Sequence, residues 1–466
     1  MANEPNSNGF LNTFFTFIEK KLFKIIEVIV IIIFAYFLFK SAILLPLIGT
    51  IFLGWLTWKI WVHYIQQDFI SGIEFVLLEI VPPREVLRSP KAMELFISNA
   101  LYHFSYKGGS EEYWQGAVWF WFSLEIASID GQVHFYIRTP SRIKELIETQ
   151  MYAQYPQSQV KVVDDYTLAV DEITPESHWN GWGCEFGLIR PEAYPIKTYI
   201  DFGLDKDPKE EYKVDPISPV VEFFGSLQKG EQAWVQIIVT PSKKEYHTHG
   251  TWFGHHDWVA EADIQMEKLL LPYTSKRDDP GEHLLKLSRI EVRVPSFLDR
   301  AVKGMSAKTG KLGFETGIRV MYLAKKEIYP VGNRTNNSRN IRLIFRQYAA
   351  PDVNEFNRIN STQGDAFGGV FTISAKTIML LADRMLHEYR ERAFFHLPLR
   401  HHLFNKHTIP WPFNILFYPV YFHHQTYILN TEELATIWHF PGQILKVPTL
   451  ERIESKEASP PTNLPT

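Results

Sequence analysis

The sequence predicts an α+β protein in which an N-terminal transmembrane helical hairpin precedes ferredoxin-like (βαββαβ) modules. Residues 22–62 are almost wholly apolar, whereas the rest of the chain has the mixed composition of a protein with a hydrophobic core. After residue 72, strand-like and helix-like segments follow in the order β-α-β-β-α-β, which is the ferredoxin-like pattern. A less regular second pass through similar elements hints that the module is duplicated.

Composition sets the outer limits of this prediction. The chain has 466 residues, of which 21% are charged and 15% aromatic, as expected of a folded protein of several domains. Its net charge is −4, so direct nucleic-acid binding is not indicated. Cys184 is the only cysteine, which excludes an intramolecular disulfide and a zinc site built from several thiolates.

The apolar stretch at residues 22–62 is too long for one membrane span. A continuous helix of that length would measure roughly 60 Å, about twice the hydrocarbon core of a bilayer. A break between Lys40 and Pro46 divides it into two arms that are each long enough to cross. The stretch is preceded or entered by several lysines (Lys20, Lys21 and Lys24).

The lysines predict a cytoplasmic N-terminus, because positive charge stays on that side. We therefore expect a multi-pass protein with two helices in the bacterial inner membrane, with the lipid bilayer as a partner and the remaining chain facing the cytoplasm. The alternative is one span followed by an interfacial helix, which would place the remaining chain outside.

The first module is expected at residues 67–170, after a tail and hairpin at residues 1–66. A strand ends at Pro82, a capped helix starts at Ser89, and Asp130-Gly131 joins two β-rich runs as in a hairpin. The expected order is strand 73–82, a helix from 89, strands 117–128 and 132–138, helix 141–154 and strand 159–166.

The second module is expected at residues 171–350 and contains a polar insertion. Residues 351–457 form a mixed region that includes an amphipathic helix at 374–393. The chain closes with a Pro-rich, linker-like tail at residues 458–466.

The sequence contains no complete motif for nucleotide binding or for acyl transfer. The segment Gly304 to Leu312 resembles a phosphate-binding loop, but it has one residue too many between its glycines. Leu312 also stands where a hydroxyl is needed. No G-x-S-x-G sequence occurs, and Cys184 lies in a strand-like run, which favours a buried structural thiol.

Histidines supply the strongest metal candidate. Imidazole and carboxylate ligands are concentrated at residues 247–257 (His247, His249, His255, His256 and Asp257). No tight H-E-x-x-H spacing is present, so a polar surface loop is favoured. The remaining candidates lie among aromatic residues and favour packing: His401, His402, His407, His423, His424 and His439. The sequence therefore assigns no catalytic, cofactor-binding or metal-binding residue, and no cofactor.

Several segments in order resemble a known family from about residue 70 onward. They are 79–83, 89–93, 123–126, 134–140, 148–156, 164–166, 215–216, 230–231 with Gln236, 314–319, 433–436, 439–441 and 460–465. The chain resembles the membrane-associated region that precedes the ATPase in bacterial type IV secretion, conjugation-type proteins. In fuller members of that family, a sequence like Pro-Pro-Thr-Asn-Leu-Pro leads into a DNA-translocating ATPase domain with a P-loop.

That ATPase domain is missing from these 466 residues. The resemblance therefore implies a non-enzymatic, membrane-anchored platform that acts with an ATPase supplied by another chain. Two alternatives stay open: a membrane-bound metal-dependent enzyme that uses the His247–Asp257 cluster, and a truncated remnant of a larger DNA-translocating ATPase. A homo-oligomer also stays open.

Overall fold

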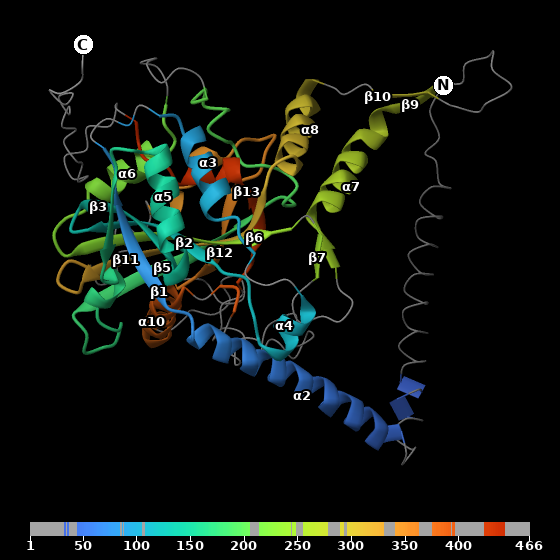
Figure 1. The fold of residues 1–466 in the computed structure, drawn as a ribbon, viewed down its shortest axis with the longest axis horizontal. Coiled ribbons are helices and arrows are strands. Elements are labelled where there is room, and N and C mark those ends of the chain that lie inside the picture. The colour runs from blue at the N-terminus through green and yellow to red at the C-terminus, as the bar shows by residue number, and fades with distance from the viewer. Residues whose placement is uncertain are drawn as a thin grey trace, which may run out of the picture. The chain divides into compact units, whose positions relative to one another are not determined.

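The computed structural model (Figure 1) divides into two compact units, Met1–Ile65 and Gln66–Thr466. The structure describes residues 32–33, 35–36, 44–83, 86, 88–104, 108–205, 214–243, 245–247, 255–277, 289–292, 296–329, 341–362, 375–392, 394–396 and 424–442.

The predicted transmembrane hairpin is wrong. Within the described residues, no helix combines the length and the apolar character that crossing a bilayer requires. The second predicted arm belongs to helix α2 (Leu44–Ser71), which continues nine residues past Val62 into Gln66, Gln67 and Asp68. Pro46 lies in the first turn of α2, where a proline interrupts no intrahelical hydrogen bond.

The multi-pass inner-membrane location, with the remaining chain facing the cytoplasm, depended on that hairpin and is corrected with it. Most of the first predicted arm, residues 22–39, lies outside the described residues, as does Lys40.

Among the described residues of the second unit, nine strands form one antiparallel sheet. Its order is β12-β5-β11-β6-β2-β3-β1-β4, and β13 also pairs with β11. The strands are β1 (Phe75–Val81), β2 (Phe122–Ile129), β3 (Gln132–Pro140), β4 (Gln159–Val163), β5 (Trp179–Leu188), β6 (Glu231–Ser242), β11 (Gly313–Lys325), β12 (Phe356–Ser361) and β13 (Tyr427–Asn430).

The overall class is α+β, and the strands of the two expected modules belong to one continuous sheet. Strands β4-β1-β3-β2 form one half of the sheet, and β12-β5-β11-β6 repeat the same sequential pattern in mirror order. The halves join where β2 pairs with β6 over residues 122–129 and 232–239. Hydrogen bonding across this seam turns the expected pair of modules into one continuous sheet.

The hairpin between β2 and β3 has the turn that its sequence predicts. Asp130 has φ 54° and Gly131 has φ 84°, and both values are positive, as a two-residue hairpin turn of type I′ requires. A Cβ atom on Gly131 would lie 2.4 Å from the carbonyl oxygen of Leu227, so this position needs glycine.

Helices cover both faces of the sheet. Successive side chains of a strand point to opposite faces, so each face contributes to its own core. Leu78 and Leu124 belong to the larger core, together with residues of α3, α5 and α6. Leu77 and Met321 belong to a second core under helix α10. The helices of the second unit are α3 (Lys91–Ala100), α4 (Gly109–Trp114), α5 (Lys144–Gln154), α6 (Ser218–Gly225), α7 (Trp258–Leu270), α8 (Ser296–Thr309), α10 (Ala375–Glu391) and α12 (Thr431–Ile437).

Shorter elements complete the described chain. The single-turn helices are η1 (Ser141–Ile143), η2 (Tyr166–Ala169), η3 (Leu271–Tyr273), η4 (Ile341–Leu343) and η5 (Arg346–Tyr348). Two small ribbons pair β7 (Glu245–His247) with β8 (His255–Asp257), and β9 (Thr274–Arg277) with β10 (Arg289–Val292).

Residues 424–442 contain β13 and α12, and we call them the anchor segment. Every residue of α12 is buried. Asn430 caps α12 in a reciprocal capping box with Glu433. The Glu433 carboxylate also lies 3.0 Å from the ammonium of Lys308, and both of these side chains are fully buried. The anchor segment is thus part of the protein core.

Candidate functional site

Polar side chains form a row that crosses the whole sheet. Each strand from β4 to β12 contributes one residue, and each residue is directly paired in register with its neighbour on the next strand. Paired residues on adjacent strands share a face of the sheet. The row contains Lys161, Glu79, Tyr136, Glu125, Gln236, Arg319, Glu185 and Asn360.

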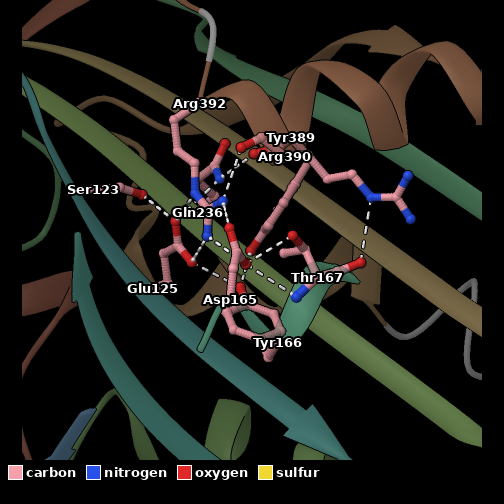
Figure 2. Close-up of polar contacts among 9 residues, drawn as sticks. All are labelled: Ser123, Glu125, Asp165, Tyr166, Thr167, Gln236, Tyr389, Arg390 and Arg392. Atoms are coloured by element: carbon pink, nitrogen blue, oxygen red, sulfur yellow. Dashed lines mark hydrogen bonds and ion pairs between the residues drawn. The ribbon is translucent and has the colours of Figure 1, made fainter. Parts of the chain in front are cut away.

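The middle of this row contains the first buried ion pair. Arg392 follows the last residue of α10, and Figure 2 shows its side chain reaching toward Glu125 and Asp165. Its Nε and one terminal nitrogen lie 2.9 and 3.1 Å from the two carboxylate oxygens of Glu125. Both side chains are fully buried, and the contact is bidentate, which is the strongest geometry for this pair. Asp165 also contacts Arg392.

Tyrosine, glutamine and serine side chains surround the Glu125 carboxylate. Ser123 donates to it at 2.5 Å, Tyr166 at 2.8 Å and Gln236 at 3.2 Å (Figure 2). The Tyr166 hydroxyl also lies 2.9 Å from that of Tyr389 on α10. Burial raises the pKa of the Tyr166 hydroxyl well above its usual value, and the negative charge of Glu125 adds to this effect. Both hydroxyls are therefore neutral hydrogen-bonding groups here.

The backbone at Arg392 is in a conformation that side chains rarely adopt. Its φ of 51° lies in the left-handed region, where the residue after a helix is usually glycine. Left-handed backbone costs a residue with a side chain about 1–2 kcal/mol. Burial disfavours the charge of Arg392, but attraction to Glu125 and Asp165 raises its pKa well above the usual value. The ion pairs therefore hold this arginine in a strained position.

A second buried cluster lies farther along the same row, on β5 and β11. The guanidinium of Arg319 contacts one oxygen of Glu185 through Nε at 3.0 Å and a terminal nitrogen at 2.7 Å. Asn360 donates to the other oxygen of Glu185 at 2.6 Å. The His424 ring stands between two carboxylates, with Nδ1 2.8 Å from Glu185 and Nε2 3.4 Å from Glu388 on α10.

The charges in this second cluster shift the pKa values of its members. Burial alone would raise the pKa of Glu185, but attraction to His424 and Arg319 lowers it to about 2. Burial raises the pKa of Glu388 despite the same attractions. Burial opposes a charge on His424, but Glu185 and Glu388 outweigh that effect and raise its pKa. The two carboxylates thus favour the protonated form of the His424 ring.

Glu185, Glu388 and His424 also have the residue types of a metal site. Their potential ligand atoms all lie within 4.8 Å of one another. However, Arg319 already contacts one oxygen of Glu185 and Asn360 donates to the other, and the charge of Arg319 would repel a divalent ion. A buried salt-bridge network describes this arrangement better than a metal centre does.

The histidines at residues 247–257 that the structure describes lie in the β7–β8 ribbon. In backbone register, His247 lies opposite His255 in the β7–β8 ribbon. Asp257 caps α7 by accepting hydrogen bonds from the amides of Val259 and Ala260 at 3.0 and 2.9 Å. His249 lies outside the described residues. Helix capping thus accounts for the candidate carboxylate.

The other candidates have structural surroundings. Cys184 is fully buried in β5, as expected of a structural thiol. Gly304 lies inside α8, and Lys311 pairs with Glu94 and Glu432 at 2.6 and 2.7 Å.

Among the predicted packing histidines, His439 is buried and contacts Asp215 at 2.9 Å. His424, also expected to pack, instead lies between the carboxylates of the second cluster. The others, His401, His402, His407 and His423, lie outside the described residues.

Sequence reasoning did not find the buried polar row. A usable signal was present, because Glu125 and Glu185 are each the one charged residue of their strand, and Arg319 stands between the apolar residues Ile318 and Val320 of β11. A single charge in a buried strand requires a partner. Arg392, the partner of Glu125, lies 267 residues farther along the chain, and His424, a partner of Glu185, lies 239 residues farther. Local sequence spacing does not reveal pairs that are so far apart.

The fold and these clusters define an α+β protein with a continuous antiparallel sheet and an internal salt-bridge row. The chain belongs to the family described as "Domain of unknown function (DUF8128)", whose model matches residues 121–360, just over half of the sequence. The matched region runs from β2 to β12 and includes Glu125, Arg319 and Glu185. No curated protein matches the chain.

Proposed function

We propose that this chain is a non-enzymatic platform that acts with a DNA-translocating ATPase supplied by another chain. The resemblance of its ordered segments to the region ahead of type IV secretion, conjugation-type ATPases supports the kind of partner. The burial of the anchor segment in the protein core supports the role as a platform, and this burial is the observation on which the proposal rests.

The anchor segment is held in the core at several points. Lys308 donates to the carbonyl of Ile428 at 2.8 Å and pairs with Glu433. The indole of Trp438 donates to the backbone carbonyl of Glu125 on β2 at 3.3 Å. Residues 443–466 follow directly in the sequence. A partner bound to them would therefore be connected to the central sheet through a buried segment.

Site-specific crosslinking in the native host tests this proposal. A photo-reactive amino acid replaces Thr462 in the Pro-rich tail. A matched position, the exposed Lys303 on α8, serves as the control. We expect the Thr462 position, and not the Lys303 position, to crosslink to a chain that contains a P-loop ATPase domain. Identification by mass spectrometry of no P-loop ATPase at Thr462 would overturn the proposal.

A metal-dependent role at the β7–β8 ribbon is a second candidate, favoured by one observation. The backbone register places His247 directly opposite His255. Metal analysis of the purified protein and of His255→Ala tests this role. Stoichiometric zinc, copper or nickel that disappears in the variant supports it, and the absence of stoichiometric metal excludes it.

A further inference from the structure

Arg138 on β3 carries a positive charge that no described residue neutralises through direct contact. In register it lies opposite Ser123 on β2 and Leu77 on β1, next to the polar row. Its guanidinium carbon lies 3.9 Å from the centre of the Phe75 ring. Stacking on an aromatic face leaves the in-plane N–H groups of a guanidinium available for other acceptors.

The surroundings make this charge costly. Burial lowers the pKa of Arg138 to about 10, and repulsion from Arg392 adds to the effect, although Glu125 and Asp165 act in the opposite direction. A partly buried cation without a hydrogen-bonded partner is unfavourable unless something else satisfies it. Arg138 is only partly buried, so a ligand can reach it.

Trp121 provides a second donor on the same aromatic wall. Its indole nitrogen is buried and has no hydrogen-bond partner, and the side chain is only 6% exposed. The Trp121 ring centre lies 5.1 Å from that of Phe75, the ring on which Arg138 stacks. Trp121 and the buried residues Val118, Ile238 and Phe394 form one apolar cluster, against which Phe75 packs. An unsatisfied buried indole N–H and a guanidinium without a direct carboxylate partner among the described residues therefore border one apolar surface.

We propose that Arg138 and Trp121 form a binding site for a carboxylate carried on an apolar or aromatic group. The guanidinium fork matches a carboxylate bidentately, and the indole N–H can donate to the same anion. The apolar part of the ligand packs against Phe75. Glu125 and Asp165 lie near enough to influence Arg138, so they oppose a dianion such as phosphate more than a monoanion. This site is independent of the proposed ATPase partner.

Titration of the intact protein with benzoate, followed by the indole N–H signals in a TROSY spectrum, tests this site. Trp121→Phe identifies the Trp121 signal. We expect benzoate to shift that signal saturably, while neutral benzamide and inorganic phosphate at equal concentration leave it unchanged. No shift with benzoate, or an equal shift with benzamide or phosphate, would overturn the carboxylate site.

Two arginine variants separate a specific site from general charge. Arg138→Gln should weaken benzoate binding about tenfold or more, because a charge-assisted pair is lost. Arg142→Gln is the matched control, since Arg142 also stacks on a phenylalanine, with its guanidinium carbon 3.9 Å from the Phe120 ring centre. It should leave binding unchanged. Unchanged remaining indole signals show that each variant is folded, and equal benzoate affinity of Arg138→Gln and the native chain would contradict the proposal.

Discussion

The two halves of the sheet each bury a glutamate in the same polar row, but they neutralise it differently. In the β4-β1-β3-β2 half, Glu125 pairs with Arg392 from the end of α10. In the β12-β5-β11-β6 half, Glu185 pairs with Arg319 on the adjacent strand and with His424 of the anchor segment. Both glutamates are fully buried.

This difference assigns a separate task to each cluster. The first cluster fixes the end of α10 against the sheet, because its arginine comes from that helix. The second cluster has its arginine within the sheet and uses a titratable histidine to fasten the anchor segment. A buried glutamate thus pairs with an arginine at the end of α10 in one half of the sheet and contacts the histidine of the anchor segment in the other.

Removal of either arginine should give the largest effect. Arg392→Met and Arg319→Met should each lower the free energy of unfolding by about 3–5 kcal/mol, because a fully buried glutamate then loses its arginine partner. Denaturant unfolding measures both variants. If Arg392→Met costs less than about 1 kcal/mol, the first cluster does not hold α10, and the comparison fails on that side.

Loss of the histidine should have a smaller, pH-dependent effect. His424→Gln should cost about 1–3 kcal/mol at pH 6, since it removes a buried hydrogen-bonding partner of Glu185. The raised pKa of His424 means that its contribution is complete below its ordinary pKa of 6.5 and declines as the pH rises through the folded-state value. Native stability should therefore fall above pH 6.5, and it should fall less steeply in His424→Gln.

The two glutamates of the second cluster also contribute to the pH dependence of stability. The raised pKa of Glu388 also makes stability decline as the pH rises above its ordinary value of 4.5. The lowered pKa of Glu185, about 2, acts oppositely, because its contribution is lost as the pH falls below 4.5. Unfolding curves from pH 3 to 9 measure the sum. A native profile that rises from pH 6.5 to 9 would contradict the assignment of charge to His424.

The cap of α12 should contribute a moderate amount. Asn430→Ala should lower the free energy of unfolding by about 1 kcal/mol, because the Asn430 side chain accepts a hydrogen bond from the Glu433 amide. Asn430→Asp keeps an acceptor at this position, but it adds a charge beside a buried carboxylate. A full recovery by Asn430→Asp would show that hydrogen bonding alone matters there.

Loss of an exposed ion pair should have the smallest effect on the free energy of unfolding. Lys303 lies 2.7 Å from Asp299 one turn earlier in α8, and the two side chains are 75% and 48% exposed. Lys303→Ala should change the free energy of unfolding by no more than about 0.5 kcal/mol. A cost comparable to that of Arg319→Met would mean that burial does not explain the difference between surface and internal pairs.

Local chemistry made part of the fold predictable. The Asp130-Gly131 turn and the apolar face of α3, with Met93 and Phe96 buried, follow from short sequence patterns. The predicted membrane hairpin is wrong because apolar composition does not determine where a helix ends, and the helix that begins at Leu44 continues into polar sequence. The joining of two halves through β2 and β6 is a long-range pairing that local patterns do not encode.

The buried polar row could not be predicted either, because its contacts also join distant parts of the chain. Glu125 is visible in the sequence as an isolated charge, but its arginine lies 267 residues farther along the chain. Asp257 looked like a metal ligand because histidines precede it, whereas its place at the start of α7 makes it a cap. Residue types thus indicated which groups need partners, and only the fold revealed which partners they have.

A double-mutant cycle on Glu125 and Arg392 tests most directly whether the ion pairs of the buried polar row hold segments such as the end of α10 against the sheet. Unfolding free energies are measured for Glu125→Gln, Arg392→Met, the double variant and the native chain. The ion-pair geometry predicts a coupling energy of about 2–3 kcal/mol, the upper part of the range for contacting residues. A coupling energy below about 0.5 kcal/mol would show that the two side chains contribute independently, and it would contradict the locking role of the row.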